Sequence, residues 1–333
     1  MRVLAVTNIY PSSERPALGT FVEQQVKGLR AIGLEVDVFH VDRAGSGMRA
    51  YWGVGADARE RARAANADLV HVMYGGVMAE EVTRVLRDRK CVVSFCGSDL
   101  LGERLSGWTR RFVSGIGVWA SHRAARRADG IVVKSRNLLD ALPAGIPAAR
   151  VRILPNGVDL ERFRPLDRAG CRARLGWSAA GFHVLFPANT GDRRKRPWIA
   201  HEAIERLRAT GVPAELHELR GVPHASVPDW INACDAVILT SLAEGSPNIV
   251  KEALACDVAV VSVDVGDVAE RIEGIGGCFI SPPDPAALAA RLGEVHAGGR
   301  VPGRERMSDL SIQRVAERLR EFYREVLAGT TRG

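Results

Sequence analysis

The sequence lacks the features that mark membrane-embedded, disulfide-rich and zinc-finger proteins. Among its 333 residues, no apolar run approaches the roughly 20 residues that a helix needs to cross a bilayer. Its six cysteines form no CxxC pair and no zinc-finger spacing, so we expect reduced thiols, no disulfide framework and no structural zinc. No small-residue cleavage site follows the first apolar run, which favours a strand there over a signal peptide. These absences predict a cytoplasmic protein.

Signatures of several nucleotide-using enzymes are also missing. No GxxxxGK[ST] phosphate loop occurs, and no GxGxxG fingerprint follows the first strand, which argues against a nucleoside triphosphatase and a nicotinamide-dependent enzyme. No Asp-x-Asp triplet offers a metal site, so no metal is expected. The net charge is +7, but no recognised nucleic-acid-binding module accompanies it, so nucleic acid is not an expected partner.

Lysine is scarce, since five lysines and 41 arginines make up the 46 basic residues. This skew is typical of GC-rich genomes. One arginine-rich stretch, residues 108–127, mixes basic side chains with aromatic and aliphatic ones. Two interpretations stand: an amphipathic helix whose apolar side joins the core, or a helix that meets an anionic membrane surface or acceptor.

Strand-like and helix-like segments alternate along nearly the whole chain, which predicts parallel sheets buried on both faces. A cluster of turn residues near positions 154–159 separates two similar arrays. We therefore expect two doubly wound α/β domains, residues 1–160 and 161–310, and a terminal helix within 311–333 that could cross back to the first domain. The expected strands are 3–7, 36–40, 69–73, 92–95, 131–134 and 151–154, then 183–187, 214–219, 236–240, 258–263 and 277–280.

The most informative segment, residues 240–255, joins a buried strand to a helix. Ser246 suits the N-cap and Pro247 suits the first helical position. The backbone amides of Asn248 and Ile249 are then expected to point out of the positive end of the helix. Such amides bind anions, and phosphate is the usual occupant.

Two glutamates flank this expected anion site. Glu244 and Glu252 lie eight positions apart, and Glu252 is too far into the helix to cap it. Carboxylates are poor ligands for phosphate, but as pure acceptors they suit the hydroxyl groups of a sugar or ribose. The bland alternative is an ordinary strand–turn–helix unit, in which glutamates are common.

Other polar residues follow the expected strands at their carboxyl ends, where doubly wound sheets bind ligands. Residues 193–196 are four consecutive basic side chains that could supply charge to a diphosphate. Gly19 opens the first helix and lets a backbone approach a ligand closely. Cys96 and Asp99 place a thiol and a carboxylate at one rim.

No histidine is placed to make Cys96 part of a Cys/His protease site. The histidines that fall within strand-like runs, where a structural role is the simpler interpretation, are His40, His71, His183 and His217.

Together these residues resemble the retaining glycosyltransferases of family 4, which have the GT-B fold of two facing Rossmann-like domains. Glu244 and Glu252 resemble the E-x7-E motif of that family. Asn156-Gly157-Val158-Asp159 is similar to its interdomain junction, and Gly19 fits its glycine loop. The resemblance implies transfer of a sugar from a nucleotide-diphosphate sugar to an acceptor hydroxyl, with retention and without a metal or cofactor. The domain at 161–310 would hold the donor.

The resemblance also implies roles for single residues. Lys195 and Arg193 would stabilise the leaving diphosphate, although Arg194 could take the place of Arg193. Glu244 would face the donor sugar, and Glu252 would bind the ribose hydroxyls. The other predicted substrate-binding residues are Asn248, Ile249, Ser246, Pro247, Gly19, Cys96, Asp99 and Asn156.

One position departs from the family pattern, because relatives often carry a histidine where this chain has Cys96. Two alternatives therefore stay open beside the transferase: a GT-B nucleotide-sugar epimerase, and a non-catalytic sugar-nucleotide-binding protein. The sequence also leaves open the donor base, the donor sugar, the acceptor and the oligomeric state.

Overall fold

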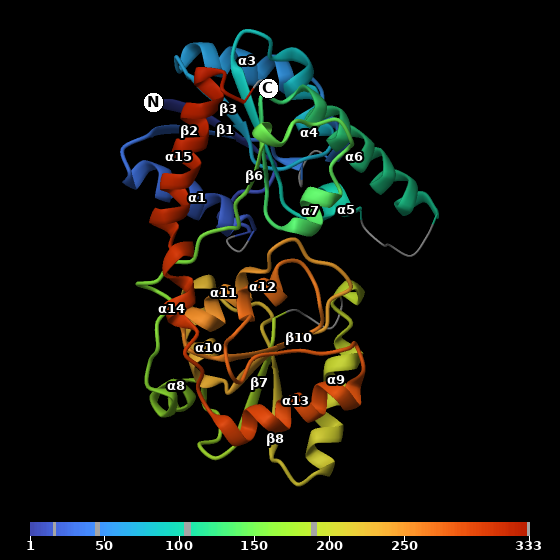
Figure 1. The fold of residues 1–333 in the computed structure, drawn as a ribbon, viewed down its shortest axis with the longest axis vertical. Coiled ribbons are helices and arrows are strands. Elements are labelled where there is room, and N and C mark those ends of the chain that lie inside the picture. The colour runs from blue at the N-terminus through green and yellow to red at the C-terminus, as the bar shows by residue number, and fades with distance from the viewer. Residues whose placement is uncertain (16–17, 44–46, 103–107, 188–191, 332–333) are drawn as a thin grey trace. The chain divides into compact units, whose positions relative to one another are not determined.

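The computed structural model describes residues 1–15, 18–43, 47–102, 108–187 and 192–331. The chain forms two compact units, Met1–Gly157 with Ile312–Gly333 and Val158–Ser311. Each unit is built on one parallel sheet, of six strands in the first and five in the second (Figure 1). Two doubly wound Rossmann-like arrays confirm the expected fold class.

In the first unit the strand order is β2-β1-β3-β4-β5-β6. Every residue of β3 and β5 is buried, as expected for parallel strands covered on both faces. The strands are β1 Arg2–Thr7, β2 Glu35–His40, β3 Leu69–Val72, β4 Lys90–Phe95, β5 Gly130–Val133 and β6 Val151–Ile153. The helices are α1 Thr20–Ala31, η1 Gly47–Tyr51, α3 Val54–Ala64, α4 Val77–Val85, α5 Ser98–Leu101, α6 Trp108–Arg127, α7 Arg136–Asp140, η2 Ala148–Arg150 and α15 Ile312–Ala328.

Helix α15 completes the first unit, although it is far from the rest of that unit in sequence. It packs against α1 (Figure 1). Its apolar face is buried at helical spacing. Its Tyr323 hydroxyl lies 2.5 Å from Nδ1 of the buried His71 on β3. Beside them, a Cβ at Gly130 would come within 2.7 Å of Val326, so a glycine lets α15 approach β5 closely.

In the second unit the strand order is β11-β10-β9-β7-β8, so β8 is an edge strand. The central strands β7 and β9 are fully buried. The strands are β7 Phe182–Phe186, β8 Ala214–Glu218, β9 Ala236–Leu239, β10 Ala259–Ser262 and β11 Phe279–Ile280. The helices are α8 Arg168–Leu175, η3 Arg193–Lys195, α9 Pro197–Ala209, η4 His224–Ser226, α10 Val227–Ala233, α11 Asn248–Ala255, α12 Val268–Ile272, α13 Pro285–Gly298, α14 Arg304–Met307 and η5 Ser308–Leu310.

Each strand expected from the sequence is present, with ends that differ by at most two residues. The start of α11 differs from the expectation. Ser246 is not its N-cap and Pro247 is not its first helical residue: the helix begins at Asn248, with Pro247 as a cap that makes no side-chain hydrogen bond. The physical reason is that the Ser246 hydroxyl donates a hydrogen bond to the carboxylate of Asp267 and is not available to cap α11.

Helix α6 divides into two parts. Its later residues Ala120, Ala124 and Ala125 are buried in the core. Phe112 in its first half and Trp119 at its middle are 61% and 58% exposed. Among the described side chains of α6, the residues that join the core therefore lie in its second half, next to an exposed Trp119. Among the described residues, no helix combines the length and apolar character needed to span a bilayer.

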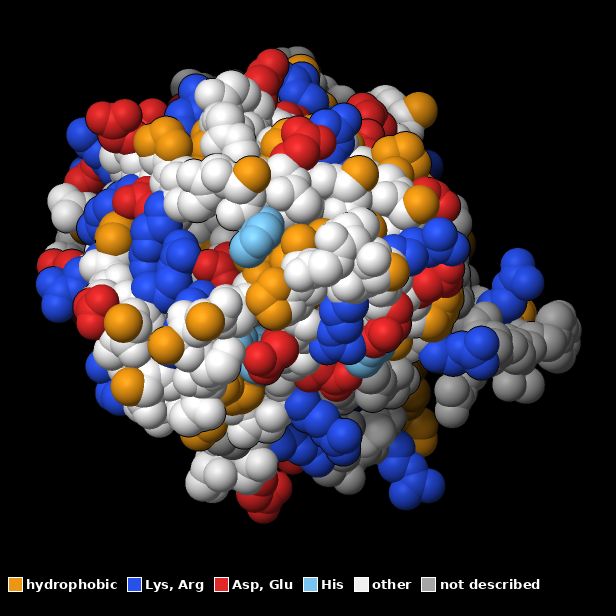
Figure 2. All heavy atoms as spheres, turned by 90° about the horizontal axis from the view of Figure 1, so that it is seen from below, with side chains coloured by type: hydrophobic (Ala, Val, Ile, Leu, Met, Phe, Trp, Pro, Cys, Tyr) orange, Lys and Arg blue, Asp and Glu red, His pale blue; other side chains and the backbone are white. Residues whose placement is uncertain are grey.

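The surface seen from below the view of Figure 1 carries basic and acidic side chains interspersed (Figure 2). Histidine side chains reach the surface among them. The excess of positive charge is thus not gathered into one patch on this face.

Candidate functional site

The candidate site begins where the basic segment meets the end of β9. The hydroxyl of Thr240 donates to the carbonyls of Lys195 at 2.6 Å and Arg196 at 3.0 Å. The Arg196 guanidinium donates back to the carbonyls of Thr240 at 2.5 Å and Ser241 at 2.9 Å. The amide of Leu242 donates to the carbonyl of Arg194 at 2.8 Å. These bonds hold the two segments side by side at the carboxyl edge of the sheet.

The four consecutive basic residues take different positions. Arg196, whose backbone is left-handed with φ +49, braces the end of β9, and burial lowers the pKa of its guanidinium. Arg194 forms an ion pair with Asp192 at 3.0 Å. Arg193 is exposed. The structure therefore favours Arg193 over Arg194 as the arginine that is open to a ligand.

Lys195 forms an ion pair with Glu244, the glutamate predicted to face the donor sugar. Its Nζ is 2.5 Å from Oε1 of Glu244, and the two side chains are 26% and 17% exposed. The pair keeps contact with solvent, so the cost of exchanging partners is modest. A cation and a hydroxyl acceptor thus stand together at the sheet edge.

A buried polar network supports the turn between Glu244 and α11. The Ser246 hydroxyl donates to Oδ2 of Asp267 at 2.9 Å and accepts from Nζ of Lys251 at 2.8 Å. Arg271 reaches the same carboxylate oxygen at 3.2 Å. Burial raises the pKa of Asp267, and Lys251 and Arg271 oppose that shift. Ser246 therefore anchors the turn to the start of α12 instead of capping α11.

Sequence reasoning missed Lys251 and Asp267. Their side chains are almost fully buried, and they are far enough apart in sequence that no spacing pattern links them. One signal in the sequence could have identified Lys251: it is one of only five lysines in the chain, and it lies within an apolar helical run.

The same turn requires a glycine in the neighbouring loop. Gly266 has φ +59, and a Cβ there would lie 2.5 Å from the carbonyl oxygen of Gly245. The backbone of the turn thus rests directly on the loop before α12. No side chain fits between them.

The first turn of α11 holds Asn248 and Ile249, whose N–H groups precede the intrahelical hydrogen-bond pattern. Glu252 is one turn further along and is partly exposed. Burial raises the pKa of Glu252 to about 7, and Lys251 and Arg162 oppose the shift. The carboxyl group is therefore about half ionised at neutral pH, whereas the sequence argument assumed full ionisation.

In the first unit, the carboxylate of Asp99 accepts hydrogen bonds from backbone amides. Its carboxylate accepts from the amides of Gly97 at 2.7 Å, Gly75 at 2.9 Å and Cys96 at 3.0 Å. Burial raises the pKa of Asp99, and these amides oppose the shift. Asp99 thus shapes the rim after β4 through the backbone and is itself buried.

Cys96 and the buried Lys134 lie beside Asp99. Burial raises the pKa of the Cys96 thiol to about 12, Asp99 adds to the shift and Lys134 opposes it. A thiol with this pKa is protonated at neutral pH, which argues against a nucleophile. Burial also lowers the pKa of Lys134, a residue that the sequence argument did not select. Its ammonium lies 3.4 Å from Oε1 of Gln25 on α1.

Gly19 and Asn156 occupy tight positions in the first unit. Gly19 has φ +73, and a Cβ there would lie 2.4 Å from the carbonyl oxygen of Ile9, so only glycine fits. Asn156 is buried near α1 and α15. The structure thus groups Lys195, Glu244, Ser246, Asn248, Ile249 and Glu252 in the second unit, and Cys96 with Asp99 in the first.

Two of the histidines interpreted as structural are neutral in the fold. Burial lowers the pKa of His71 to about 3, with Lys134 adding to the shift. Burial also lowers the pKa of His217 to about 4, with His183 adding to the shift. Neither imidazole carries a charge at neutral pH.

Two family models match this chain. Residues 189–297 match the model described as Glycosyl transferases group 1, and residues 18–162 match Glycosyltransferase Family 4. The D-inositol 3-phosphate glycosyltransferase 1 of Catenulispora acidiphila is 28% identical, over 61% of this chain and 58% of that protein. A putative teichuronic acid biosynthesis glycosyltransferase of Bacillus subtilis is 26% identical over 88% of each chain. A D-inositol 3-phosphate glycosyltransferase of Frankia alni is 29% identical over 43% of this chain.

The chain spans 58% and 44% of the length of the relatives from C. acidiphila and F. alni. Among solved structures, sucrose-phosphate synthase from Thermosynechococcus elongatus is similar with a TM-score of 0.79 at 17% identity, over 98% of this chain and 100% of that one. Anabaena HepE in complex with UDP-glucose has a TM-score of 0.67 at 17% identity, over 98% and 100%. A UDP-GlcNAc 2-epimerase from Methanocaldococcus jannaschii has a TM-score of 0.60 at 9% identity, over 97% and 99%. At these identities the likeness extends to the fold alone.

Proposed function

The chain belongs to the group 1 glycosyltransferases of family 4, and we propose that it transfers a sugar from a nucleotide-diphosphate sugar to an acceptor hydroxyl with retention. The observation that carries the proposal is the Lys195–Glu244 pair beside the first turn of α11. A cation, helix amides and a hydroxyl acceptor together match a ligand that carries both phosphate and sugar.

Donor binding would redistribute this pair. The ammonium of Lys195 would turn to the diphosphate, and the carboxylate of Glu244 would be released to accept hydrogen bonds from the donor sugar. Because both side chains are partly exposed, the exchange would cost little. The ion pair would thus hold both groups in place until the donor arrives.

Stabilisation of the leaving diphosphate would rest on positive groups. Lys195 and Arg193 would supply charge, and the amides of Asn248 and Ile249 would add the positive end of the α11 dipole. The bond from the anomeric carbon to the phosphate oxygen would break while the bond to the acceptor oxygen forms on the same face. The acceptor proton would pass to the departing phosphate.

Glu252 would hold the nucleotide ribose, where two hydroxyl groups can donate to one carboxylate. We assign the acceptor to the first unit, whose rim is built by Cys96 and the turn that Asp99 braces. The exposed apolar residues of α6 support an acceptor carried at a membrane surface.

A screen of donors tests the proposal. Thermal unfolding is measured with UDP-, GDP-, ADP- and dTDP-sugars, since a bound donor stabilises the fold by mass action. UDP-glucose is the first choice because HepE was solved with it. The donor that raises the unfolding temperature is then incubated with candidate acceptors, and the glycosylated product is identified by mass spectrometry.

Three outcomes would contradict the proposal. If no nucleotide sugar raises the unfolding temperature, the assignment of the donor site is wrong. Conversion of the donor into an isomeric sugar without any acceptor would instead favour an epimerase, the activity named for the M. jannaschii structure. Binding without turnover across the acceptor panel would favour a non-catalytic binding protein.

A further inference from the structure

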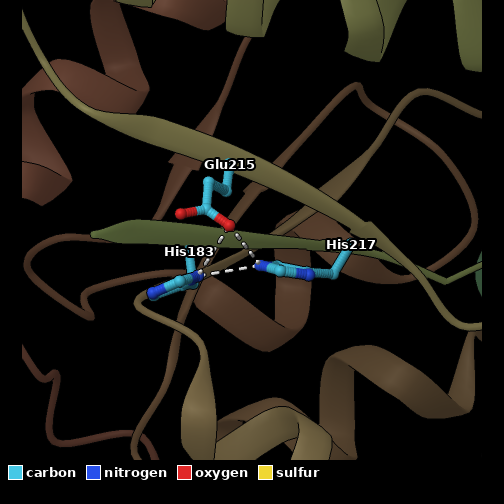
Figure 3. Close-up of side chains that lie close together, drawn as sticks. All are labelled: His183, Glu215 and His217. Atoms are coloured by element: carbon cyan, nitrogen blue, oxygen red, sulfur yellow. Dashed lines mark hydrogen bonds and ion pairs between the residues drawn. The ribbon is translucent and has the colours of Figure 1, made fainter. Parts of the chain in front are cut away.

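A second polar cluster lies between β7 and β8 and includes none of the residues of the candidate donor site. It consists of His183 on β7 with Glu215 and His217 on β8, and the three side chains point toward one another (Figure 3). Nδ1 of His183 lies 2.8 Å from Nε2 of His217. Oε2 of Glu215 lies 3.9 Å from the first nitrogen and 3.8 Å from the second. Two nitrogens and one carboxylate oxygen therefore converge on one point.

The protons of this cluster can be placed from its outer contacts. Nε2 of His183 lies 2.9 Å from the carbonyl oxygen of Ser178, which can only accept, so Nε2 carries the proton. The lone pair of His183 is then on Nδ1, the nitrogen that faces the cluster. Oε1 of Glu215 accepts from the Ser178 hydroxyl at 3.3 Å, which leaves Oε2 toward the two imidazoles. Residues that ligate metals are oriented by outer hydrogen bonds of this kind.

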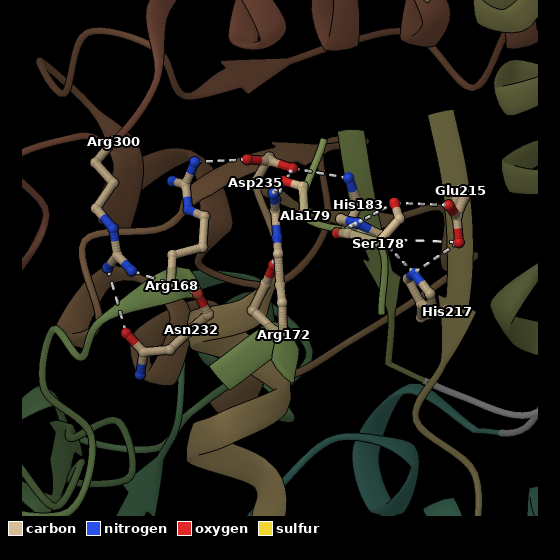
Figure 4. A network of polar contacts seen from close by, with 11 residues as sticks. Arg168, Arg172, Ser178, Ala179, His183, Glu215, His217, Asn232, Asp235 and Arg300 are labelled. Carbon is tan, nitrogen blue, oxygen red and sulfur yellow. Dashed lines mark hydrogen bonds and ion pairs between the residues drawn. The ribbon is translucent and has the colours of Figure 1, made fainter. Parts of the chain in front are cut away.

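The positions of the two rings are fixed by further contacts. The Trp177 ring stacks on His217, with ring centroids 3.5 Å apart and an interplanar angle of 11°. The backbone amide of His183 donates to Asp235 at 2.7 Å, and Arg172 pairs with the same carboxylate at 2.7 Å (Figure 4). A Cβ at Gly181 would lie 2.8 Å from Nε2 of His183, so the glycine leaves room for the ring. The arrangement is preorganised.

We propose that His183, Glu215 and His217 bind a divalent transition-metal ion of the zinc class. Two imidazole nitrogens and one carboxylate oxygen form a ligand set that zinc accepts in a tetrahedral site, with water in the fourth position. The side chain of Glu215 is 46% exposed and that of His217 is 15% exposed, so the cluster has a path to solvent. The Nε2 proton of His217, which bridges the two rings without the ion, moves to Nδ1 or to solvent when the ion binds.

The role of the ion follows from the sheet order. Strand β8 is at the edge of the sheet, and the cluster spans β8 and its single neighbour β7. A metal ion there ties the edge strand to the sheet and stabilises the second unit by mass action. The site is independent of the donor site, so its ligands can be changed without touching the residues assigned to sugar transfer.

The test uses the untagged full chain, freed of metal with a chelator and titrated with Co²⁺. The expected result is one Co²⁺ per chain, with the visible absorption bands of a tetrahedral cobalt site, and displacement by Zn²⁺. Glu215→Gln and His217→Gln should each weaken binding about tenfold or more. The control is His201→Gln, because His201 and Glu218 form a two-residue pair at 3.3 Å without a third ligand.

Zn²⁺ should raise the unfolding temperature of the wild-type chain and of His201→Gln, but not of the Glu215→Gln/His217→Gln double variant. Circular dichroism reports whether each variant is folded, and Glu215→Gln keeps the test informative because that side chain is the most exposed of the three ligands. The proposal is overturned if the wild-type chain shows no tetrahedral cobalt spectrum, or if the folded Glu215→Gln variant binds Co²⁺ as tightly as the wild type.

Discussion

At the scale of single residues, the site in the second unit is organised around exchangeable charges. Lys195 and Glu244 satisfy each other, whereas Arg196 is committed to carbonyl oxygens of the sheet edge. A group that takes part in binding must be able to change partners, and partial exposure makes this possible. Lys195 is therefore the cation that we expect to matter most for turnover.

Replacement of Lys195 by alanine should lower kcat about 100-fold with a small change in KM. The reason is that loss of one preorganised hydrogen-bond donor to a developing negative charge lowers kcat by about that factor. Steady-state transfer kinetics with the preferred donor provide the measurement. Arg194→Ala is the matched control, because Arg194 pairs with Asp192, and it should change kcat by less than about threefold. Equal effects of the two substitutions would contradict the assignment.

Glu252 should make donor affinity depend on pH. Its pKa is raised to about 7, so its carboxyl is about one-tenth ionised at pH 6 and about nine-tenths ionised at pH 8. Because the ionised form accepts both ribose hydroxyls, the dissociation constant of the donor should fall several-fold between pH 6 and pH 8. Calorimetric titration measures it.

The Glu252→Gln variant serves as the control for that titration. It cannot ionise, so it should bind the donor about as weakly as the wild-type chain does at low pH and with little dependence on pH. If the donor affinity of the wild-type chain stays constant from pH 6 to pH 8, the assignment of Glu252 to the donor site is wrong.

At the scale of elements, α11 is positioned by a lysine inside the fold. Lys251 projects from α11, bonds to Ser246 and stands by the carboxylate of Asp267 at the start of α12. A buried carboxylate that loses a nearby cation is left with an uncompensated charge. The network thus couples the folding of this turn to the placement of the first-turn amides.

Lys251→Met should therefore destabilise the protein by about 3 kcal/mol, with Arg271 retaining part of the compensation. Lys251→Met/Asp267→Asn should recover part of the loss, because it removes the charge as well as its partner. Urea unfolding of the single and double variants measures both values. A single variant as stable as the wild type would show that the network is not stabilising.

Helix α6 leads to a prediction on membrane contact. If its exposed aromatic residues meet an anionic surface, Phe112→Ala/Trp119→Ala should reduce co-sedimentation with phosphatidylglycerol vesicles several-fold. Trp52→Ala is the control, since Trp52 is 80% exposed and lies outside α6. If the two variants co-sediment with the vesicles to the same extent, α6 is not the part of the protein that contacts the membrane.

At the scale of the whole molecule, the chain leaves the first unit at Gly157 and returns to it at Ile312. Helix α15 then fills one side of the first sheet, where Tyr323 meets His71. The stability of the first unit thus depends on residues that follow the entire second unit.

Tyr323→Phe should lower the free energy of unfolding by about 1–2 kcal/mol, because it leaves Nδ1 of the buried His71 without its hydroxyl partner. Donor binding should not change, since the donor is assigned to the second unit. Thermal unfolding with and without donor checks both statements. A loss of donor affinity in this variant would contradict the division of labour between the units.

The sequence alone determined the features that depend on neighbours along the chain. Alternating apolar runs predicted every strand, because parallel strands covered on both faces must be apolar throughout. The ligand itself stays a prediction: the helix-start amides suggest phosphate, and the carboxylates of Glu244 and Glu252 suggest hydroxyl groups. Local turn chemistry was less informative: serine is a favoured N-cap residue, but the hydroxyl of Ser246 bonds to Asp267 and does not cap α11.

The partners of the polar side chains depend on packing between distant segments and could not be predicted from local sequence. Ser246 reaches Asp267, Asp99 turns to backbone amides, and the neighbouring basic residues take different partners: Arg196 the carbonyls after β9, Arg194 Asp192 and Lys195 Glu244. His183 and His217 converge although 34 positions separate them, because β7 and β8 are adjacent in register. Contacts between residues far apart in sequence follow from strand order and side-chain packing, which no local pattern of residues encodes.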